Sequence, residues 1–332
     1  MEKLNVSLLI KDAKARLTGK EVTRLAVIHA GVTVAAGLII TLLQFALSEG
    51  IGNTGGLSGM GTRSILETMQ TMLQWANTVL LPFWNLGFIY ACLQWARKNT
   101  PDTRDLLTGF HRVGPCIGLI FNRMILTIAV VVLCVNVGSV VYMMTPAGQQ
   151  LTELSTSATS VEDLYAILDQ AEGATLLSAM TPLLIICLAL SAALLVPLLY
   201  RFRLAEYAIV NHHGVRALPA MLISSTLLRR RCWQLLRLDL KFWWYYGMKL
   251  LCLVLFYGDW LLPALGVELP FGDDALFLLT YVVYLAALFG VEACFRPRVE
   301  TAYALFYEAA MEKGPVPKKG VAKPQNMPWN VQ

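Results

Sequence analysis

Long stretches of this chain carry no charged side chain, and they constrain its fold more than any other feature. Two of them are Leu25–Leu47 and Ala174–Tyr200. A bilayer core about 30 Å thick needs roughly 20 apolar residues in a helix that rises about 1.5 Å per residue. Because backbone amides in lipid must hydrogen-bond within their own segment, such stretches must be helical. The sequence therefore predicts membrane-spanning helices.

The composition agrees, since 56% of the residues are hydrophobic and only 15% are charged, whereas soluble proteins carry about 25% charged residues. We predict an all-α fold: a polytopic membrane helix bundle of about six transmembrane helices plus two interfacial amphipathic helices. The first span is too long for a signal peptide, whose apolar region has about 7–15 residues. The predicted spans are about 25–47, 72–95, 115–144, 174–200, 242–266 and 275–295.

The spans belong to one predicted transmembrane domain over residues 1–311. Residues 312–332 are rich in proline and lysine and predict a disordered cytoplasmic tail. The two interfacial helices are expected within residues 1–24 and 201–241, because apolar side chains recur there at helical spacing among basic ones. In the first of these segments the apolar side chains are Val6, Leu9, Ile10, Ala13 and Leu17.

The distribution of lysine and arginine predicts the orientation of the chain. The segments 1–24, 97–114, 201–241 and 296–332 hold all but three of the 27 basic residues. The loop over 145–173 holds five acidic residues and no basic one. Because positively charged loops stay in the cytoplasm, we expect a multi-pass protein of the cell (plasma) membrane with both termini cytoplasmic.

Several fragments in order along the chain resemble a bacterial membrane-protein family called domain of unknown function 975. They are DAKARLTGK (Asp12–Lys20), DLLTGF (Asp105–Phe110), the stretch from Tyr200 through Ala208 to Trp244, and FYEA (Phe306–Ala309). The chain departs from the family's pattern at Pro197-Leu198, where the family tends to have Pro-Gly. The resemblance implies an uncharacterised bacterial multi-pass integral membrane protein, and it implies no reaction, ligand or catalytic residue.

Three charged residues fall inside predicted spans and form the best candidate site. Arg123, Lys249 and Glu292 each lie a few residues from the cytoplasmic end of the third, fifth and sixth span. Charges in hydrocarbon are costly and mark function by default, although long side chains can extend to the interface. Two interpretations stay open: extended side chains with a structural ion pair, or an intramembrane charge cluster that binds a lipid phosphate or a substrate.

A second group of basic residues predicts contacts with the membrane surface. Arg229, Arg230, Arg231 and Arg237 lie beside a predicted span. Anionic lipid headgroups attract such residues by about 1 kcal/mol each. We therefore expect the lipid bilayer and its anionic headgroups as partners, no nucleic acid, and a protein partner that the sequence does not identify.

The remaining motifs predict no metal and no cofactor. His212-His213 has no cysteine or carboxylate at ligand spacing, and the seven cysteines form no CxxC pair. His29 in the first span is expected to be a packed side chain. The string GIGNTG, Gly50 to Gly55, follows a membrane helix instead of a strand, so a flexible loop is the better interpretation than a nucleotide site.

The sequence also lacks the motifs of intramembrane enzymes, including HExxH and G-x-S-x-G. We therefore predict no enzyme but a non-catalytic envelope or accessory component that interacts with lipid or a membrane partner. The alternative is a transporter or channel subunit for a small solute or lipid. A continuous polar cavity reaching Asn85 and Asn136 would favour transport, whereas a dry apolar centre would favour the accessory role.

Overall fold

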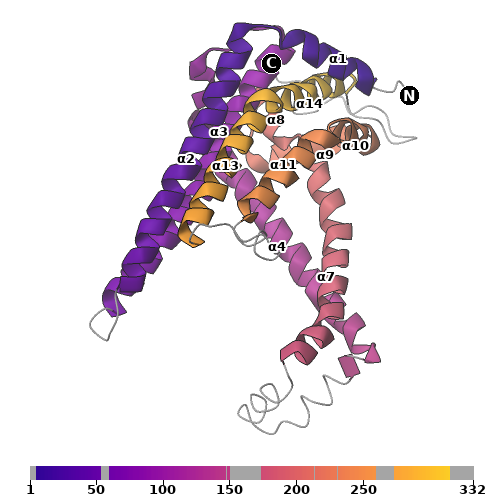
Figure 1. The fold of residues 1–332 in the computed structure, drawn as a ribbon. Helices are drawn as coiled ribbons and strands as arrows, with labels where there is room; N and C mark the ends of the chain where they lie inside the picture. Colours follow the sequence, from indigo (N-terminus) through magenta and orange to yellow (C-terminus); the bar gives the residue numbers. More distant parts are fainter. Residues whose placement is uncertain are drawn as a thin grey trace. The chain divides into compact units, whose positions relative to one another are not determined.

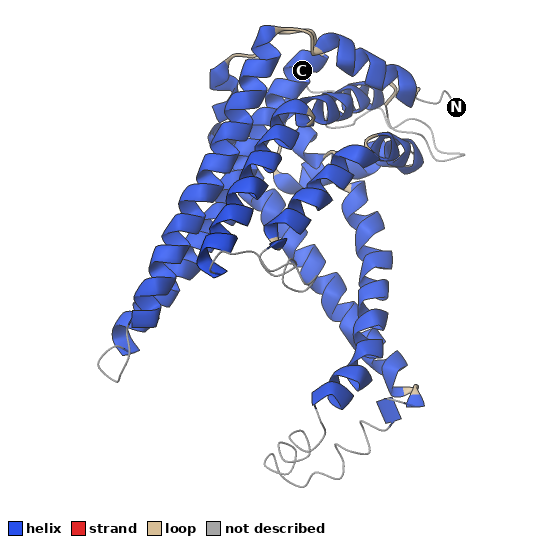
Figure 2. Ribbon diagram, viewed as in Figure 1, coloured by secondary structure: helices blue, strands red, loops and turns tan. Residues whose placement is uncertain are grey.

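The computed structural model describes residues 5–53, 60–146, 148–149, 173–212, 214–229, 231–258 and 273–314. These residues form helices joined by short connections, and no strand occurs among them (Figure 2). The helical structure confirms the predicted all-α class, and five helices are long and apolar enough to cross a membrane. They are Lys20–Ser48, Ser64–Ala96, Thr103–Met143, Thr181–Asn211 and Leu279–Glu312.

The predicted span over 242–266 is only partly described. Its described part is α11 (Trp243–Phe256), an apolar helix of 14 residues. Residues 259–272, which include Asp259, lie outside the described residues, as do 150–172 of the predicted outer loop and 315–332 of the predicted tail. The number of six spans therefore stays a prediction.

Contacts group the chain into two compact units, one made of residues 1–117 and 204–332 and the other of 118–203. The first unit contains α2, α3 and α13, which run side by side, and α11 packs on α13 (Figure 1). Its described elements are α1 (Val6–Arg16), α2 (Lys20–Asn53), α3 (Met60–Ala96), η2 (Thr103–Arg112), α8 (Ala205–Asn211), α9 (Ala217–Leu228), α10 (Cys232–Lys241), α11, α13 (Asp273–Cys294) and α14 (Arg296–Glu312).

Helix α14 is largely buried in the first unit, although no helix was predicted over its residues. It packs against α1 and α3. Alanines alternate with aromatic rings along it, and Ala302, Ala304, Phe306 and Tyr307 are fully buried. Small residues allow neighbouring helices to approach closely while the rings fill the remaining volume. The core of this unit therefore extends beyond the long apolar helices into its basic end.

The segment 201–241 forms three helices, α8, α9 and α10, in place of the one helix that was predicted. Helix α8 packs on α9 and α3 and is buried almost throughout. In α9, Met221 and Leu228 are buried, whereas Leu218 and Leu222 are exposed. Leu218 and Leu222 are four residues apart and lie on a different face of this helix from Met221, Ser224 and Leu228, so its apolar side chains do not form one buried stripe.

The 3₁₀ helix η2 lies directly against α3 because two glycines remove side chains from the contact. A Cβ atom on Gly87 would lie 1.8 Å from the carbonyl oxygen of Leu106, and one on Gly109 would lie 1.8 Å from that of Phe83. Both distances are far below contact distance, and the obstructing atoms belong to the backbone. Gly109 is the glycine of the DLLTGF fragment, so its absence of a side chain has a direct packing reason.

The second unit pairs α4 with α7. Helix α4 (Val113–Met143) begins in the first unit and runs through this one, and α7 (Gly173–Arg201) contains Pro182 and Pro197 without ending at either. Gly138 of α4 faces Cys187 of α7, whose Sγ would lie 2.6 Å from an added Cβ. The small residues therefore allow these two helices to approach closely.

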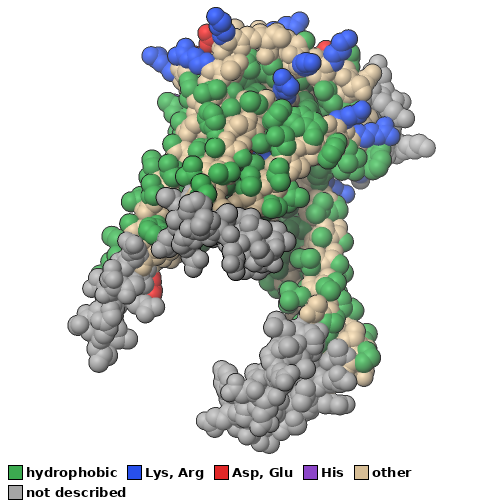
Figure 3. Space-filling model, in the orientation of Figure 1, with side chains coloured by type: hydrophobic (Ala, Val, Ile, Leu, Met, Phe, Trp, Pro, Cys, Tyr) green, Lys and Arg blue, Asp and Glu red, His purple; other side chains and the backbone are tan. Residues whose placement is uncertain are grey.

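The basic side chains of the first unit gather at one end. Figure 3 shows lysines and arginines over the end where α1 and α14 lie, whereas hydrophobic side chains dominate the visible flank along the long helices. Exposed apolar side chains of α2, α11 and α13 include Ile39, Leu42, Leu250 and Val282. An apolar flank of this extent is expected where lipid replaces water as the solvent.

The contact of η2 with α3 gives a first prediction. Gly87→Ala and Gly109→Ala each force the two backbones apart, so we expect either substitution to lower the free energy of unfolding by about 3 kcal/mol. Thermal unfolding of the purified protein in detergent measures this. The control is Gly247→Ala, where an added Cβ has no neighbour within 4 Å. Equal midpoints for Gly87→Ala and the control would contradict the close packing.

Candidate functional site

The candidate site is a buried ion cluster where α13 turns into α14. Glu292 lies in the last turn of α13, and Arg296 is the first residue of α14. The chain turns at Phe295, and the four-residue spacing keeps both side chains on one side of the corner. Lys249 reaches the same point from α11. We call Lys249, Glu292, Arg296, Glu300 and Asn85 the corner cluster.

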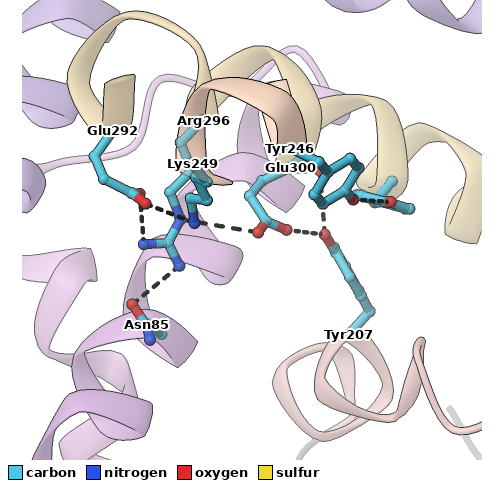
Figure 4. A network of polar contacts seen from close by, with 8 residues as sticks. Asn85, Tyr207, Tyr246, Lys249, Glu292, Arg296 and Glu300 are labelled. Carbon is cyan, nitrogen blue, oxygen red and sulfur yellow. Dashed lines mark hydrogen bonds and ion pairs between the residues drawn. The ribbon is translucent and has the colours of Figure 1, made fainter. Parts of the chain in front are cut away.

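Glu292 is the centre of the corner cluster, with only 5% of its side chain exposed. Its Oε1 lies 2.7 Å from Nζ of Lys249, and its Oε2 accepts a hydrogen bond of 2.9 Å from Nη1 of Arg296 (Figure 4). Each carboxylate oxygen therefore has its own cation. Charge-assisted bonds of this kind are stronger than those between neutral groups.

Arg296 connects Glu292 to the other helices. Its Nη2 donates to Oδ1 of Asn85 on α3 at 3.0 Å, and its Nε lies 3.8 Å from Oε1 of Glu300. The guanidinium also lies over the ring of Phe88, 5.5 Å from the centroid, which is a cation–π distance. Tyr207 of α8 then donates to Oε2 of Glu300 at 2.7 Å (Figure 4). One arginine thus connects three helices, and a fourth joins through Glu300.

The charges of the corner cluster balance, because two carboxylates face one lysine and one arginine. In a region of low dielectric constant an unpaired charge is costly, whereas a paired and hydrogen-bonded one is tolerated. Around it, His29 has only 1% exposure and lies between Trp84 and Phe88, at centroid distances of 5.7 and 4.2 Å. Within the described residues, Nε2 of His29 has no hydrogen-bond partner.

The predicted site residues separate into two places. Lys249 and Glu292 meet as an ion pair at 2.7 Å, a contact that both interpretations of these charges include. Arg123 belongs to the second unit, where its Nη2 donates to the carbonyl oxygen of Phe202 at 2.9 Å. Arg296 was not predicted as a site residue, although its spacing of four residues from Glu292 is the usual spacing of helical ion pairs.

Arginines in the basic segments bind helix ends. Arg231 is only 8% exposed, and its guanidinium donates to the carbonyl oxygens of Ala310 and Gly314 at the end of α14, at 2.9 and 3.0 Å. Arg112 donates to the carbonyl oxygens of Ile209 and His212 at the end of α8. The last carbonyls of a helix lack backbone donors and carry partial negative charge, so a guanidinium stabilises them.

The other predicted surface residues differ among themselves. Arg229 is exposed, and Arg230 and His213 lie outside the described residues. Arg237 lines a groove of about 690 Å³ between the start of α1 and the junction of α10 with α11. The groove lining is Asn5, Val6, Ser7, Arg237, Leu240, Lys241 and Trp243. Burial lowers the pKa of Arg231, which binds the end of α14, from its ordinary value.

A second polar group lies at the basic end. Arg97 donates to Asn211 of α8 and pairs with Glu308 of α14 at 2.7 Å, and Asn211 contacts His212. Burial, followed by the neighbouring Arg97, holds the pKa of His212 below its ordinary value. Among the described residues, no group of three histidines, cysteines or carboxylates has the arrangement of a metal site.

Comparisons of this chain with models of protein families, with curated proteins and with solved structures yield no match. The resemblance to the domain of unknown function 975 therefore stays a prediction. What the site does must be argued from its own chemistry.

The corner cluster gives a second prediction. Glu292→Gln leaves the positive charges of Lys249 and Arg296 in excess, so we expect a loss of about 3 kcal/mol in the free energy of unfolding. Adding Lys249→Gln removes one of the excess cations and should restore part of that loss. The measurement is thermal unfolding in detergent.

The matched control is Glu308→Gln, because Glu308 pairs with Arg97 but is 30% exposed on its side chain. Exposed pairs contribute about 0–1 kcal/mol, so this variant should lose little. If Glu292→Gln and Glu308→Gln were equally mild, the corner cluster would not stabilise the fold.

Proposed function

We propose that this protein is a non-catalytic multi-pass component of the cell membrane that binds anionic lipid headgroups at its cytoplasmic face. The groove beside Arg237 and Lys241 carries the proposal. It combines two cationic side chains with an exposed indole, Trp243, and with the small polar side chains of Asn5 and Ser7. A lipid phosphate needs cationic donors, and tryptophan favours the headgroup level of the bilayer.

The position of the groove supports the same function. It lies where α10 ends and the apolar helix α11 begins, so its basic residues adjoin a flank suited to lipid. Cation–π contact of Arg237 with Trp233, at 5.6 Å, keeps a second indole beside it. In this proposal the bacterial cell membrane surrounds the long helices, as the resemblance to the domain of unknown function 975 also implies.

The proposed orientation has both termini in the cytoplasm, and the distribution of basic residues supports it. We expect a fluorescent protein fused after residue 332 to be fluorescent and a phosphatase inserted near residue 160 to be active. The first reporter folds only in the cytoplasm and the second only outside it. An active phosphatase after residue 332 would contradict the orientation.

The groove gives a further prediction. Arg237→Gln with Lys241→Gln removes two cations that each contribute about 1 kcal/mol near an anionic surface, so binding of phosphatidylglycerol should weaken by more than about tenfold. Native mass spectrometry of the detergent-purified protein measures retained and added lipid. Phosphatidylcholine should bind weakly to both forms.

The control pair is Arg104→Gln with Arg298→Gln, which removes the same charge from exposed sites outside the groove. We expect this pair to retain most phosphatidylglycerol binding. Equal losses in both pairs would mean that net charge alone attracts the lipid. Unchanged binding in the groove variant would reject the proposal.

Solute transport is the second candidate, and one observation favours it. A pocket of about 400 Å³ lies between α2, α3, α11 and α13, and its lining includes threonine, glutamine and tyrosine side chains. Neither Asn85 nor Asn136 lines it. Asn136 donates instead to the carbonyl oxygen of Val132 within α4. The pocket is thus polar, but it is not the continuous cavity through both amides that would favour transport most.

A further inference from the structure

The pocket between α2, α3, α11 and α13 is separate from the headgroup groove, and partly buried and exposed polar side chains gather around it. Its polar lining includes Thr33, Thr41 and Gln44 from α2 and Gln74 and Thr78 from α3. Amides and hydroxyls within membrane-spanning helices are costly unless they have partners. Five such groups line this one pocket.

Three hydroxyl groups that line the pocket, those of Thr33, Thr78 and Tyr281, donate their hydrogens within the protein. Thr33 donates to the carbonyl oxygen of His29 at 2.8 Å, and Thr78 donates to that of Gln74 at 2.9 Å. Tyr281 of α13 donates to Oγ1 of Thr41 at 2.7 Å. The hydroxyl oxygens therefore remain as acceptors for a ligand that brings its own donors.

A proline interrupts the hydrogen bonding of α3 next to the lining residue Leu81. Pro82 lies inside α3 and has no N–H to donate to the carbonyl oxygen of Thr78, four residues earlier. Freed carbonyls of interrupted membrane helices commonly take part in binding sites. Gln44 and Gln74 supply amide groups that both donate and accept. The pocket therefore contains more hydrogen-bond acceptors than donors, and the two glutamine amides supply donors.

Aromatic rings form the opposite part of the lining. Phe256 of α11 lies 5.2 Å from Tyr284 of α13, and Tyr281 lies 6.0 Å from Tyr284, between ring centroids. Ring faces pack well against the C–H faces of a small molecule. No lysine, arginine, aspartate or glutamate is among the lining residues. Because the lining has no charge to compensate one, a charged ligand would be excluded by its cost of desolvation.

The pocket is closed toward the corner cluster. Thr33, Leu81 and Leu288 line it, and one helical turn further along the same helices lie His29, Asn85 and Glu292. His29 is packed between Trp84 and Phe88, and Asn85 and Glu292 are bound by Arg296. A packed and hydrogen-bonded layer therefore forms one end of the pocket, which suits a bound molecule better than free passage.

We propose that this pocket binds a small, uncharged, hydroxyl-rich molecule, namely a polyol or sugar, either as a free solute or as the headgroup of a glycolipid. Hydroxyl groups donate to the excess acceptors, the amides accept and donate in return, and the ring faces cover the apolar side of the ligand. The volume is within the range of about 300–1,000 Å³ of ordinary small-molecule sites. The proposal does not depend on the headgroup groove.

The test uses the full chain in lipid nanodiscs without sugar-based detergent, and it measures saturation transfer from the protein to ligand protons by NMR. The probes are glucose for the free solute, octyl glucoside below its micellar concentration for the headgroup, and glucose 6-phosphate as the charged counterpart. We expect transfer to glucose or octyl glucoside and at least tenfold less to glucose 6-phosphate. Transfer to octyl glucoside alone identifies the headgroup as the source.

Two variants remove the site in different ways. Gly37→Leu fills the pocket, since an added Cβ at this lining residue has no neighbour within 4 Å. Gln44→Met with Gln74→Met removes the amides at nearly constant length. We expect each to reduce transfer to the sugar at least tenfold, and the second variant keeps the test valid if the first does not fold.

The matched controls are Gly290→Leu, another helical glycine with open space at its Cβ, and Gln70→Met, one turn from Gln74 on α3. Neither residue lines the pocket, so both variants should retain sugar binding. The proposal is overturned if the wild-type protein transfers saturation to neither sugar, or if Gly37→Leu and the glutamine pair bind as the controls do.

Discussion

The first unit depends on the two ion pairs that the carboxylate of Glu292 makes. They hold a lysine and an arginine from two other helices at the point where α13 turns into α14. Lys249 comes from α11 and Arg296 from α14, so removal of the carboxylate would leave both in excess. Arg296 then extends the contact to Asn85 of α3 and to Glu300. Buried ion pairs contribute little net stability against an apolar replacement, but they specify geometry. Here the ion pairs specify how the buried helix α14, which is moderately polar, packs against the apolar helices α3 and α13.

Apolar periodicity and length were sufficient to predict the long helices. The stretches around Leu25–Leu47 and Ala174–Tyr200 became α2 and α7, because lipid leaves their backbones no alternative to a helix. The buried helix α14 was missed for the opposite reason: its composition of alanine, aromatic and charged residues has no apolar stripe. Its burial results from tertiary packing against α1 and α3, which a local pattern does not contain. The same holds for Gly87 and Gly109, whose role exists only in the contact between two segments.

Only those residues of the site were predictable whose charge interrupts an apolar stretch of the sequence. Lys249 and Glu292 were recognised because a charge in an apolar stretch is conspicuous, and the structure pairs them. Arg296 was assigned to a basic segment outside the span, and Arg231 was assigned to headgroups, although its guanidinium binds the end of α14. Positive charge near a membrane has two uses, binding lipid and satisfying helix carbonyls. Composition does not distinguish them, because the difference depends on which helix ends nearby.

The position of Arg296 after the last long apolar helix has a consequence for biogenesis. Arg296 leaves the ribosome only four residues after Glu292, and Lys249 precedes both. The carboxylate of Glu292 therefore reaches the membrane with one cation already synthesised and the other directly behind it. The order of synthesis thus spares α13 from inserting with an uncompensated negative charge.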